Sequence, residues 1–350
     1  MTVRLLQVML APGDGGAETF FEKLAIAFQE VGVCQRLLIC QHAQRRARLE
    51  AAGCDVVEIP AQGWRKWLAK RSVAKVAEGF RPTHQLAWMS RAAGALSRRQ
   101  DCVNLARLGG YYPLKYYSEC DWLVGNTPSV MAHLKKIGWA EARMRLISNF
   151  GELPDLPDAG STALRYELGL GADVQVIITL GRLHVNKAQD VLINALPSIP
   201  DAVLLIAGEG ELRGELETLA KSLGVADRLH FLGWRRDTPA LFELADVCVF
   251  PSRQEPLGNV VLEAWAHGVP VAAAASEGPA WLIEDGGNGL LFPIDDVAAC
   301  AAAANRLLAD GALVRTCVEG GRSKWQSSYS KEAIVTEYLN FFKEVGVRRK

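Results

Sequence analysis

Residues 250–271 read FPSRQEPLGNVVLEAWAHGVPV, and this stretch combines the end of a strand, a polar loop and the start of a helix. The apolar run at 246–250 predicts the strand, and a helix is predicted to begin near Asn259. Glu255 lies in the loop and Glu263 follows eight positions later, on the first turns of the helix. Unpaired N–H groups at a helix N-terminus attract a phosphate, and two neighbouring carboxylates can accept hydrogen bonds from sugar and ribose hydroxyls. The stretch therefore fits a nucleotide-sugar, and the alternative is a capping loop with two solvated glutamates.

Length and composition set the frame for this stretch. A chain of 350 residues suits two domains, and no run of 18 apolar residues predicts a membrane span or a signal peptide. Eight cysteines are scattered without metal-ligand spacing, so we expect buried thiols rather than disulfides or a metal site. Residues 1–150 carry 21 Lys/Arg against 12 Asp/Glu and residues 151–350 carry 18 against 27, which predicts a basic first half for an anionic partner.

The first half opens as a nucleotide-binding α/β unit. An apolar strand at 3–10 is followed by the loop PGDGG, which contains Gly15 and Gly16, and then by an amphipathic helix. The loop lacks the pattern G-x-G-x-x-G because Glu18 stands in the place of the third glycine, so a dinucleotide fingerprint is not supported. The two glycines would still allow backbone amides to approach a ligand.

Two further segments of the first half have open interpretations. Residues 64–81, WRKWLAKRSVAKVAEGFR, predict either a basic amphipathic helix for an anionic membrane or an ordinary surface helix with its apolar stripe in the core. The loop Gly109-Gly110-Tyr111-Tyr112, after a strand, predicts either an acceptor-binding loop or a turn with packing aromatics. His133 has no partner at metal spacing, so we expect a surface helix residue.

The second half repeats the strand and helix alternation after a proline-rich linker at 149–157. We therefore predict domains at 1–152 and 153–325, and a C-terminal helical segment at 326–350 that returns to the first domain. The buried strand at 174–180 runs into Arg182 and Lys187, two cations beside a helix start that suit a diphosphate. Gly208-Glu209-Gly210 follows the next strand and resembles a phosphate loop.

Taken in order, these second-half motifs resemble the donor-binding domain of retaining glycosyltransferases of family 4. The resemblance spans about residues 175–295 and rests on Gly181-Arg182 with Lys187, on Gly208-Glu209-Gly210 and on the E-x7-E pattern from Glu255 to Glu263. It implies an α/β fold of two Rossmann-like domains that face a central cleft (GT-B), with the C-terminal helix packed on the first domain. The first half is similar more loosely, through Gly15-Gly16 and the Asn149 linker.

The resemblance also implies roles for individual residues. Arg182 and Lys187 would bind the donor diphosphate, Glu255 would accept hydrogen bonds from the donor sugar, and Glu263 would do so from the ribose. The catalytic set would be Glu255, Arg182 and Lys187. The wider donor-binding set would comprise Gly15, Gly16, Arg182, Lys187, Gly208, Glu209, Leu257, Gly258, Asn259 and Glu263. Charge on the leaving diphosphate would be stabilised by positive groups and amides already in place, and no D-x-D sequence occurs, so neither a metal nor a cofactor is expected.

Three positions depart from the family pattern. Ala188 stands where the lysine motif usually continues with glycine, and Pro279-Ala280-Trp281 replaces the acid often present there. Many members carry a histidine late in the first domain, where this chain has Arg107. The candidates for acceptor contacts are therefore Arg91, Arg107 and Tyr111.

By this resemblance we expect a metal-independent, hexosyl-type retaining glycosyltransferase. It would use a UDP- or GDP-sugar and a saccharide or lipid-linked acceptor, as in polysaccharide or lipopolysaccharide biosynthesis. The alternatives are a non-catalytic nucleotide-sugar binder and an epimerase of the same fold. We expect a cytoplasmic location and no nucleic-acid partner, and the basic segment at 64–75 raises the hypothesis of contact with the inner face of the cytoplasmic membrane.

Overall fold

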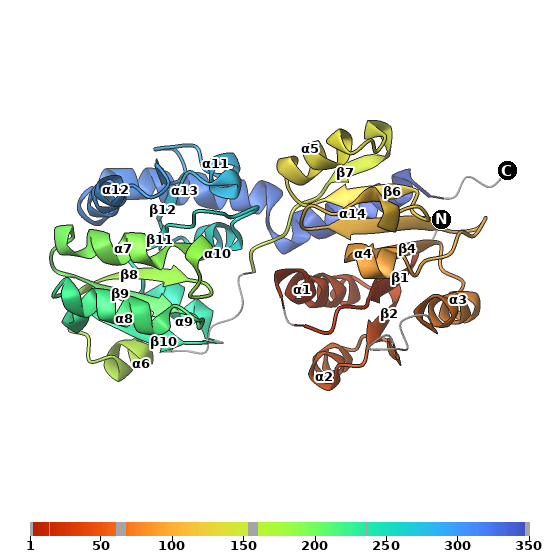
Figure 1. Cartoon of the computed structure of the whole chain (residues 1–350), viewed down its shortest axis with the longest axis horizontal. Coiled ribbons are helices and arrows are strands. Elements are labelled where there is room, and N and C mark those ends of the chain that lie inside the picture. Colours follow the sequence, from red (N-terminus) through yellow and green to blue (C-terminus); the bar gives the residue numbers. More distant parts are fainter. Residues whose placement is uncertain (1–2, 14, 61–67, 153–159, 236, 347–350) are drawn as a thin grey trace. The chain divides into compact units, whose positions relative to one another are not determined.

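The computed structural model describes residues 3–13, 15–60, 68–152, 160–235 and 237–346. The chain divides into two compact units, one formed by Met1–Asn149 with Lys331–Lys350 and the other by Phe150–Ser330. We call these unit 1 and unit 2 and describe each by itself (Figure 1). The predicted start of the C-terminal segment at 326 falls inside a helix of unit 2, and the helix that belongs to unit 1 begins at Lys331.

Unit 1 is built on a seven-stranded parallel sheet in the order β3-β2-β1-β4-β5-β6-β7. The strands are β1 (Arg4–Met9), β2 (Cys34–Cys40), β3 (Val56–Ile59), β4 (His84–Trp88), β5 (Val103–Leu108), β6 (Trp122–Gly125) and β7 (Met144–Leu146). The helices are α1 (Gly16–Glu30), α2 (Ala43–Ala51), α3 (Ala69–Phe80), α4 (Met89–Ala93), α5 (Pro128–Lys136) and α14 (Lys331–Glu344), with short 3-10 turns at η2 (Leu114–Tyr116) and η3 (Glu141–Arg143).

Side chains alternate between the two faces of this sheet, and each face has its own helices. Leu6, Val8 and Leu10 of the first strand and its end pack in one core with α3, α4 and α5. On the other face, Phe28 of α1 meets Tyr338 and Phe342 of α14, with ring centroids 5.8 and 6.0 Å apart. The prediction that the C-terminal helix packs on the first domain is therefore confirmed.

Unit 2 has a six-stranded parallel sheet in the order β10-β9-β8-β11-β12-β13. Its strands are β8 (Gln175–Leu180), β9 (Ala202–Ala207), β10 (Leu229–Gly233), β11 (Val247–Phe250), β12 (Val271–Ala274) and β13 (Leu290–Phe292). Its helices are α6 (Gly160–Glu167), α7 (Gln189–Ala195), α8 (Arg213–Ser222), α9 (Thr238–Leu244), α10 (Asn259–His267), α11 (Glu277–Leu282), α12 (Val297–Ala309) and α13 (Gly311–Ser328), with 3-10 turns η4 (Val185–Lys187), η5 (Leu196–Ser198) and η6 (Ala226–Arg228). Two clusters of buried side chains, one on each face, form its core.

The first six strands of unit 1 and all six strands of unit 2 have the Rossmann order, in which the third, second and first strands are followed by the fourth, fifth and sixth. The predicted class, α/β with two Rossmann-like domains, is confirmed. Sequence predicts this arrangement well because fully buried parallel strands are continuous apolar runs that alternate with amphipathic helices.

Two predictions about the surface and the cysteines meet the structure at this level. In α3, the apolar stripe formed by Val73, Ala77 and Phe80 is buried in the core of unit 1, as expected of an ordinary surface helix. Trp64 and Trp67, on which the membrane hypothesis depends, lie outside the described residues. All eight cysteines are free and seven are buried, and burial raises the pKa of Cys102 to about 12.

Candidate active site

The topology of each sheet marks one place where a ligand is expected. In doubly wound sheets, ligands bind beyond the carboxyl ends of the strands where the strand order reverses, because the two loops there diverge to opposite faces. In unit 2 this switch point lies between β8 and β11, and in unit 1 it lies between β1 and β4 (Figure 1). The loops after these four strands carry most of the predicted site residues.

In unit 2, the loop after β8 carries the two predicted cations. Arg182 is exposed, and the structure records no hydrogen bond or ion pair of its side chain with the described residues. Lys187 ends the turn η4, directly before Ala188, whose φ of 53° is left-handed. A left-handed backbone explains why the related lysine motif continues with glycine there, since a Cβ is disfavoured in that conformation.

Lys187 and Glu255 form an ion pair across the switch point. The Lys187 Nζ donates to Glu255 Oε2, and the other carboxylate oxygen accepts the Gly258 N–H at 3.2 Å. The two side chains are 28% and 13% exposed, so the pair is partly shielded from water and still open on one side. Two residues 68 positions apart are thus brought into one site, at the N-terminus of α10.

The loop that precedes α10 is shaped by close backbone packing. Gly258 caps the helix with a φ of 91°, and the Gly278 N–H donates to the Glu255 carbonyl at 2.8 Å. A Cβ on Gly278 would lie 2.3 Å from the Leu257 carbonyl oxygen, so only glycine fits there. Leu257 is buried, whereas Asn259 is exposed at the first position of the helix.

Glu263 lies one turn further along α10, separate from the Lys187–Glu255 pair. It is half-buried, and its carboxylate adds to the effect of burial, the main cause, in raising the pKa of Cys248 on β11. The chain near Gly151 passes so close to α10 that a Cβ there would lie 2.5 Å from the Leu262 carbonyl oxygen. Glu263 therefore lies at the point on α10 against which the chain at Gly151 packs.

The loop after β9 packs against the loop after β8. The Leu183 N–H donates to the Glu209 carbonyl at 2.9 Å, and a Cβ on Gly208 would lie 1.9 Å from the Gly181 carbonyl oxygen. The Glu209 side chain remains exposed. Gly208 thus serves the packing of two backbones, and this packing brings Glu209 beside the loop that carries Arg182 and Lys187.

Arg253 was not predicted as a site residue, and it connects the two switch-point loops of unit 2. Its Nη1 donates to the Val185 carbonyl at 2.8 Å, and its guanidinium pairs with Asp190 at 2.5 Å and Asp295 at 2.5 Å. The Gln254 N–H adds a bond to the Asn186 carbonyl at 3.3 Å. These contacts hold η4, and hence Lys187, beside Glu255. Arg253 is the one lysine or arginine in the stretch 250–271, and that signal could have pointed to it.

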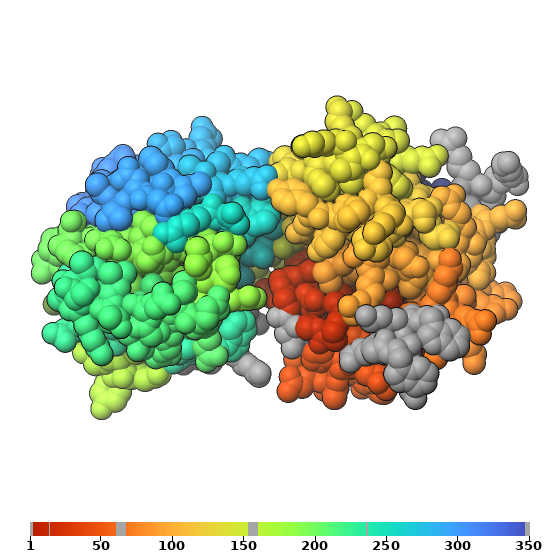
Figure 2. Space-filling model, viewed as in Figure 1, coloured from red at the N-terminus to blue at the C-terminus, as the bar shows by residue number. Residues whose placement is uncertain are grey.

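In unit 1, the glycine loop (residues 11–16, of which 14 lies outside the described residues) follows β1. Gly15 and Gly16 are exposed at the N-terminus of α1. Arg91, an exposed candidate for acceptor contact, donates from Nη1 to the Leu10 carbonyl at 3.0 Å, just before this loop. Arg45 of α2 donates to the Ala11 and Gly13 carbonyls of this loop, at 2.9 and 2.5 Å. The segment that contains α1, red in Figure 2, is visible at the surface of unit 1.

The other two acceptor candidates lie in different environments. Arg107 is 2% exposed, its guanidinium donates to Asn149 Oδ1, and it lies over the rings of Phe20 and Trp88 at 4.6 and 5.0 Å. Burial lowers its pKa. Tyr111 is 51% exposed, and its ring meets that of His133 at 5.2 Å. Of these two, Tyr111 is therefore the side chain that solvent and a ligand can reach.

Within the described ranges, no group of three or more His, Cys, Asp or Glu side chains is arranged to hold a metal ion. No single helix in the same ranges is long and apolar enough to cross a membrane, while one sharply bent pair, Val297–Ala309 with Gly311–Glu344, meets the criteria of length and composition.

With this geometry in place, comparison with known proteins assigns the class. The family described as "Glycosyl transferases group 1" matches residues 174–310, a range that contains the β8 and β11 loops. Over 93% of its length the chain is 35% identical to the lipopolysaccharide core biosynthesis glycosyltransferase LpsE of Rhizobium meliloti (strain 1021), of which 95% is covered. The chain belongs to this family of glycosyltransferases and is an enzyme of that class.

Two further matches are informative. LpsD of the same organism, also described as a lipopolysaccharide core biosynthesis glycosyltransferase, is 32% identical, with 94% of this chain and 95% of LpsD covered. Among solved structures, Anabaena Alr3699/HepE in complex with UDP and glucose superposes with a TM-score of 0.82 at 20% identity, covering 98% of this chain and 100% of HepE. The latter likeness shows the fold, which is that of GT-B glycosyltransferases.

Proposed function

We propose that this glycosyltransferase transfers a hexosyl group from a UDP- or GDP-sugar to a saccharide acceptor of the lipopolysaccharide core type, with retention of configuration and without a metal ion. The acceptor class is supported by the two relatives that match nearly the whole chain, both described as lipopolysaccharide core biosynthesis enzymes. The donor class is supported by one observation above all, the Lys187–Glu255 pair at the N-terminus of α10.

In this proposal the cations and amides of unit 2 bind the donor diphosphate. Arg182 is exposed and uncommitted among the described residues, and Lys187 lies beside it on the same loop. The amides of Leu257, Gly258 and Asn259 begin α10, where the helix dipole favours an anion. As the bond to the sugar breaks, negative charge grows on the leaving diphosphate, and these groups stabilise that charge without rearrangement.

The carboxylates then recognise the hydroxyl groups of the donor. Glu255 would accept hydrogen bonds from the sugar, Glu263 from the ribose, and Glu209 lies on the adjacent loop as a further donor contact. In unit 1, exposed Gly15 and Gly16 would contact the phosphate-bearing part of the donor. Tyr111 and Arg91 are the accessible candidates for acceptor contact.

The ion pair gives the site a defined change on ligand binding. Without donor, Lys187 neutralises Glu255, so neither charge is left uncompensated in a partly shielded site. When a diphosphate binds, Lys187 gains a more highly charged anionic partner, and Glu255 becomes free to accept hydrogen bonds from the sugar. The same two residues would thus couple phosphate binding to sugar recognition.

Replacing Glu255 tests this function directly. We expect Glu255→Ala to lower transfer from UDP- or GDP-sugars to core oligosaccharide by roughly 10² to 10³-fold, measured by mass spectrometry of the product. The melting temperature should change little, because Lys187 is open enough to be hydrated when its partner is lost. Glu217→Ala, which removes an exposed carboxylate of α8, is the matched control and should retain activity.

The outcomes also separate the alternative functions. Full transfer by Glu255→Ala would contradict the proposed site. Isomerisation of the donor sugar by the wild-type protein without acceptor would indicate an epimerase. Binding of UDP-sugars with neither transfer nor slow donor hydrolysis would indicate a non-catalytic binder.

A further inference from the structure

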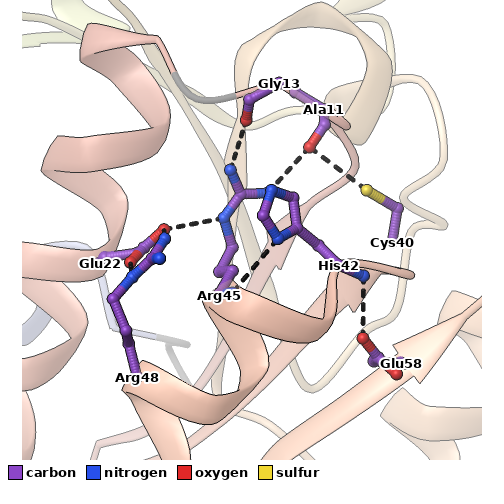
Figure 3. Close-up of polar contacts among 8 residues, drawn as sticks. All are labelled: Ala11, Gly13, Glu22, Cys40, His42, Arg45, Arg48 and Glu58. Carbon is purple, nitrogen blue, oxygen red and sulfur yellow. Dashed lines mark hydrogen bonds and ion pairs between the residues drawn. The ribbon is translucent and has the colours of Figure 1, made fainter.

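Arg45 is a fully buried arginine in unit 1 that plays no part in the functions discussed above. It lies on the first turn of α2 with 0% exposure, and its guanidinium points towards the loop after β1 (Figure 3). A charged side chain is almost never fully buried unless its donors are satisfied by partners. The partners of Arg45 therefore indicate what the residue is for.

Three donors of Arg45 have three separate acceptors. Nε donates to Glu22 Oε1 at 2.9 Å, Nη1 to the Ala11 carbonyl at 2.9 Å and Nη2 to the Gly13 carbonyl at 2.5 Å (Figure 3). Two of these acceptors are backbone carbonyls of the glycine loop. The rigid fork of the guanidinium thus fixes two peptide groups of the loop at a defined separation.

The surroundings of Arg45 hold it in place and balance its charge. Glu22 of α1 is 9% exposed and accepts two further hydrogen bonds from Arg48, at 2.7 and 2.9 Å. The start of α2 is fixed in turn, because the His42 N–H donates to Glu58 of β3 at 2.9 Å. The loop is therefore attached through Arg45 to α1, α2 and the edge strand of the sheet.

Two further contacts hold the chain at the start of the loop. Arg91 of α4 donates to the Leu10 carbonyl at 3.0 Å, and Cys40 Sγ donates to the Ala11 carbonyl at 3.2 Å. Three of the six residues in this loop are glycine, and glycine loses more conformational freedom on ordering than other residues. Without these contacts, a ligand that binds the loop would have to order it at a cost in affinity.

We infer that Arg45 is a positioning residue that holds the glycine loop in the shape in which Gly15 and Gly16 present their backbone to the phosphate-bearing donor. The inference rests on the proposed function for the identity of the ligand. Arg45 does not touch the donor; it acts through the Ala11 and Gly13 carbonyls. The Ala11 and Gly13 carbonyls are turned to the guanidinium, while Gly15 and Gly16 remain exposed at the start of α1.

Variants of α2 test the inference. Arg45→Met removes the three donors, while Glu22 keeps Arg48 as a partner, so the variant should fold. We expect its KM for the donor to rise and kcat/KM to fall by roughly ten to a hundredfold, with KM for the acceptor unchanged. Arg45→Lys, which restores charge and some donors, should recover part of the loss. Arg46→Met removes an exposed arginine of the same helix, paired with Glu50 and Glu58, and should behave as wild type.

Amide exchange gives a second readout that needs no ligand. The Thr19 N–H donates to the Gly15 carbonyl at 2.9 Å, so the first turn of α1 reports on the loop. In Arg45→Met this turn should exchange faster, while β5 is unchanged. Isothermal titration with UDP should give weaker binding by Arg45→Met than by Arg46→Met.

The results distinguish this inference from the proposed function. Wild-type protein without transferase activity, combined with faster exchange in Arg45→Met, would refute the proposed function and support the role of Arg45 in holding the glycine loop. An active wild type, with Arg45→Met equal to Arg46→Met in KM, UDP binding and exchange, would overturn the inference that Arg45 holds the glycine loop. A loss of kcat with unchanged donor KM and faster exchange throughout unit 1 would indicate a purely structural residue and also overturn it.

Discussion

Units 1 and 2 share one strand order, yet their switch points are built differently. In unit 2 the loops after β8 and β11 bring charged side chains together, with Lys187 on Glu255 and Arg182 exposed nearby. In unit 1 the loop after β1 exposes Gly15 and Gly16, and the buried Arg45 donates to two of its carbonyls. The family match at 174–310 falls within unit 2 alone.

This difference teaches that the same topology can present a ligand with side chains or with backbone. A site of charged side chains leaves motifs at fixed spacing, such as E-x7-E, because each side chain has its own chemistry. A backbone site needs only residues that allow close approach, and its supporting residues can come from any neighbouring element. Unit 1 therefore contains the less recognisable half of the proposed machinery.

The largest expected effect contrasts glycines from the two units. Gly208 of unit 2 has a φ of 152° and no room for a Cβ, whereas a Cβ on Gly16 of unit 1 would meet nothing within 4 Å. We expect Gly208→Ala to destabilise the protein by about 4 kcal/mol or more and Gly16→Ala to leave the fold intact while lowering activity. Urea denaturation and activity assays check both, and equal stability of the two variants would contradict the contrast.

The second effect concerns the support of the charged site in unit 2. Arg253→Met should lower kcat/KM by roughly ten to a hundredfold, because η4 and Lys187 lose the link to the loop that carries Glu255. Arg213→Met, which removes an exposed arginine of α8, is the control in steady-state assays. Activity equal to that of the control would mean that the loops keep their positions without Arg253.

The third effect belongs to unit 1 and depends on pH. His84 of β4 is buried against Phe342 of α14, and burial lowers its pKa from 6.5 to about 4. The unfolded chain therefore binds a proton at His84 more readily than the folded one. The contribution of neutral His84 to the free energy of unfolding is present above pH 6.5 and is lost as pH falls towards 4. Between pH 7 and pH 5 we expect a loss of about 2 kcal/mol in the free energy of unfolding. Urea denaturation at both pH values checks this, and His84→Gln should abolish that part of the pH dependence.

The smallest effect tests whether unit 1 also contacts a membrane. The hypothesis depends on Trp64, Trp67 and their basic neighbours, because the described part of α3 turns its apolar stripe into the core. It predicts weak, salt-sensitive sedimentation with vesicles of anionic phospholipid. Binding that persists unchanged after both tryptophans become alanine and Lys66, Lys70 and Arg71 become glutamine would remove the basis for the hypothesis.

Much of the fold and part of the site could be predicted because their signals are local. The apolar runs at 3–10 and 174–180 identify buried strands, and the spacing of Glu255 and Glu263 places one carboxylate on a loop and one on a helix. Arg107 illustrates the limit of such reasoning. It was a candidate for acceptor contact because it stands where the related family often has a histidine, whereas the structure places it within β5, 2% exposed, over the rings of Phe20 and Trp88. The sequence contains no signal for which neighbour a side chain will meet.

By itself, the sequence of this protein determined its alternating α/β class, its two sheets and the family to which its second half is similar, since periodicity and motif spacing are properties of neighbouring residues. Only the tertiary structure decided that Lys187 pairs with Glu255, that Arg253 connects their loops and that Arg45 holds the glycine loop. These contacts join residues 32 to 68 positions apart. Such pairs are set by which strand ends lie side by side, and that depends on the order of strands across the whole sheet.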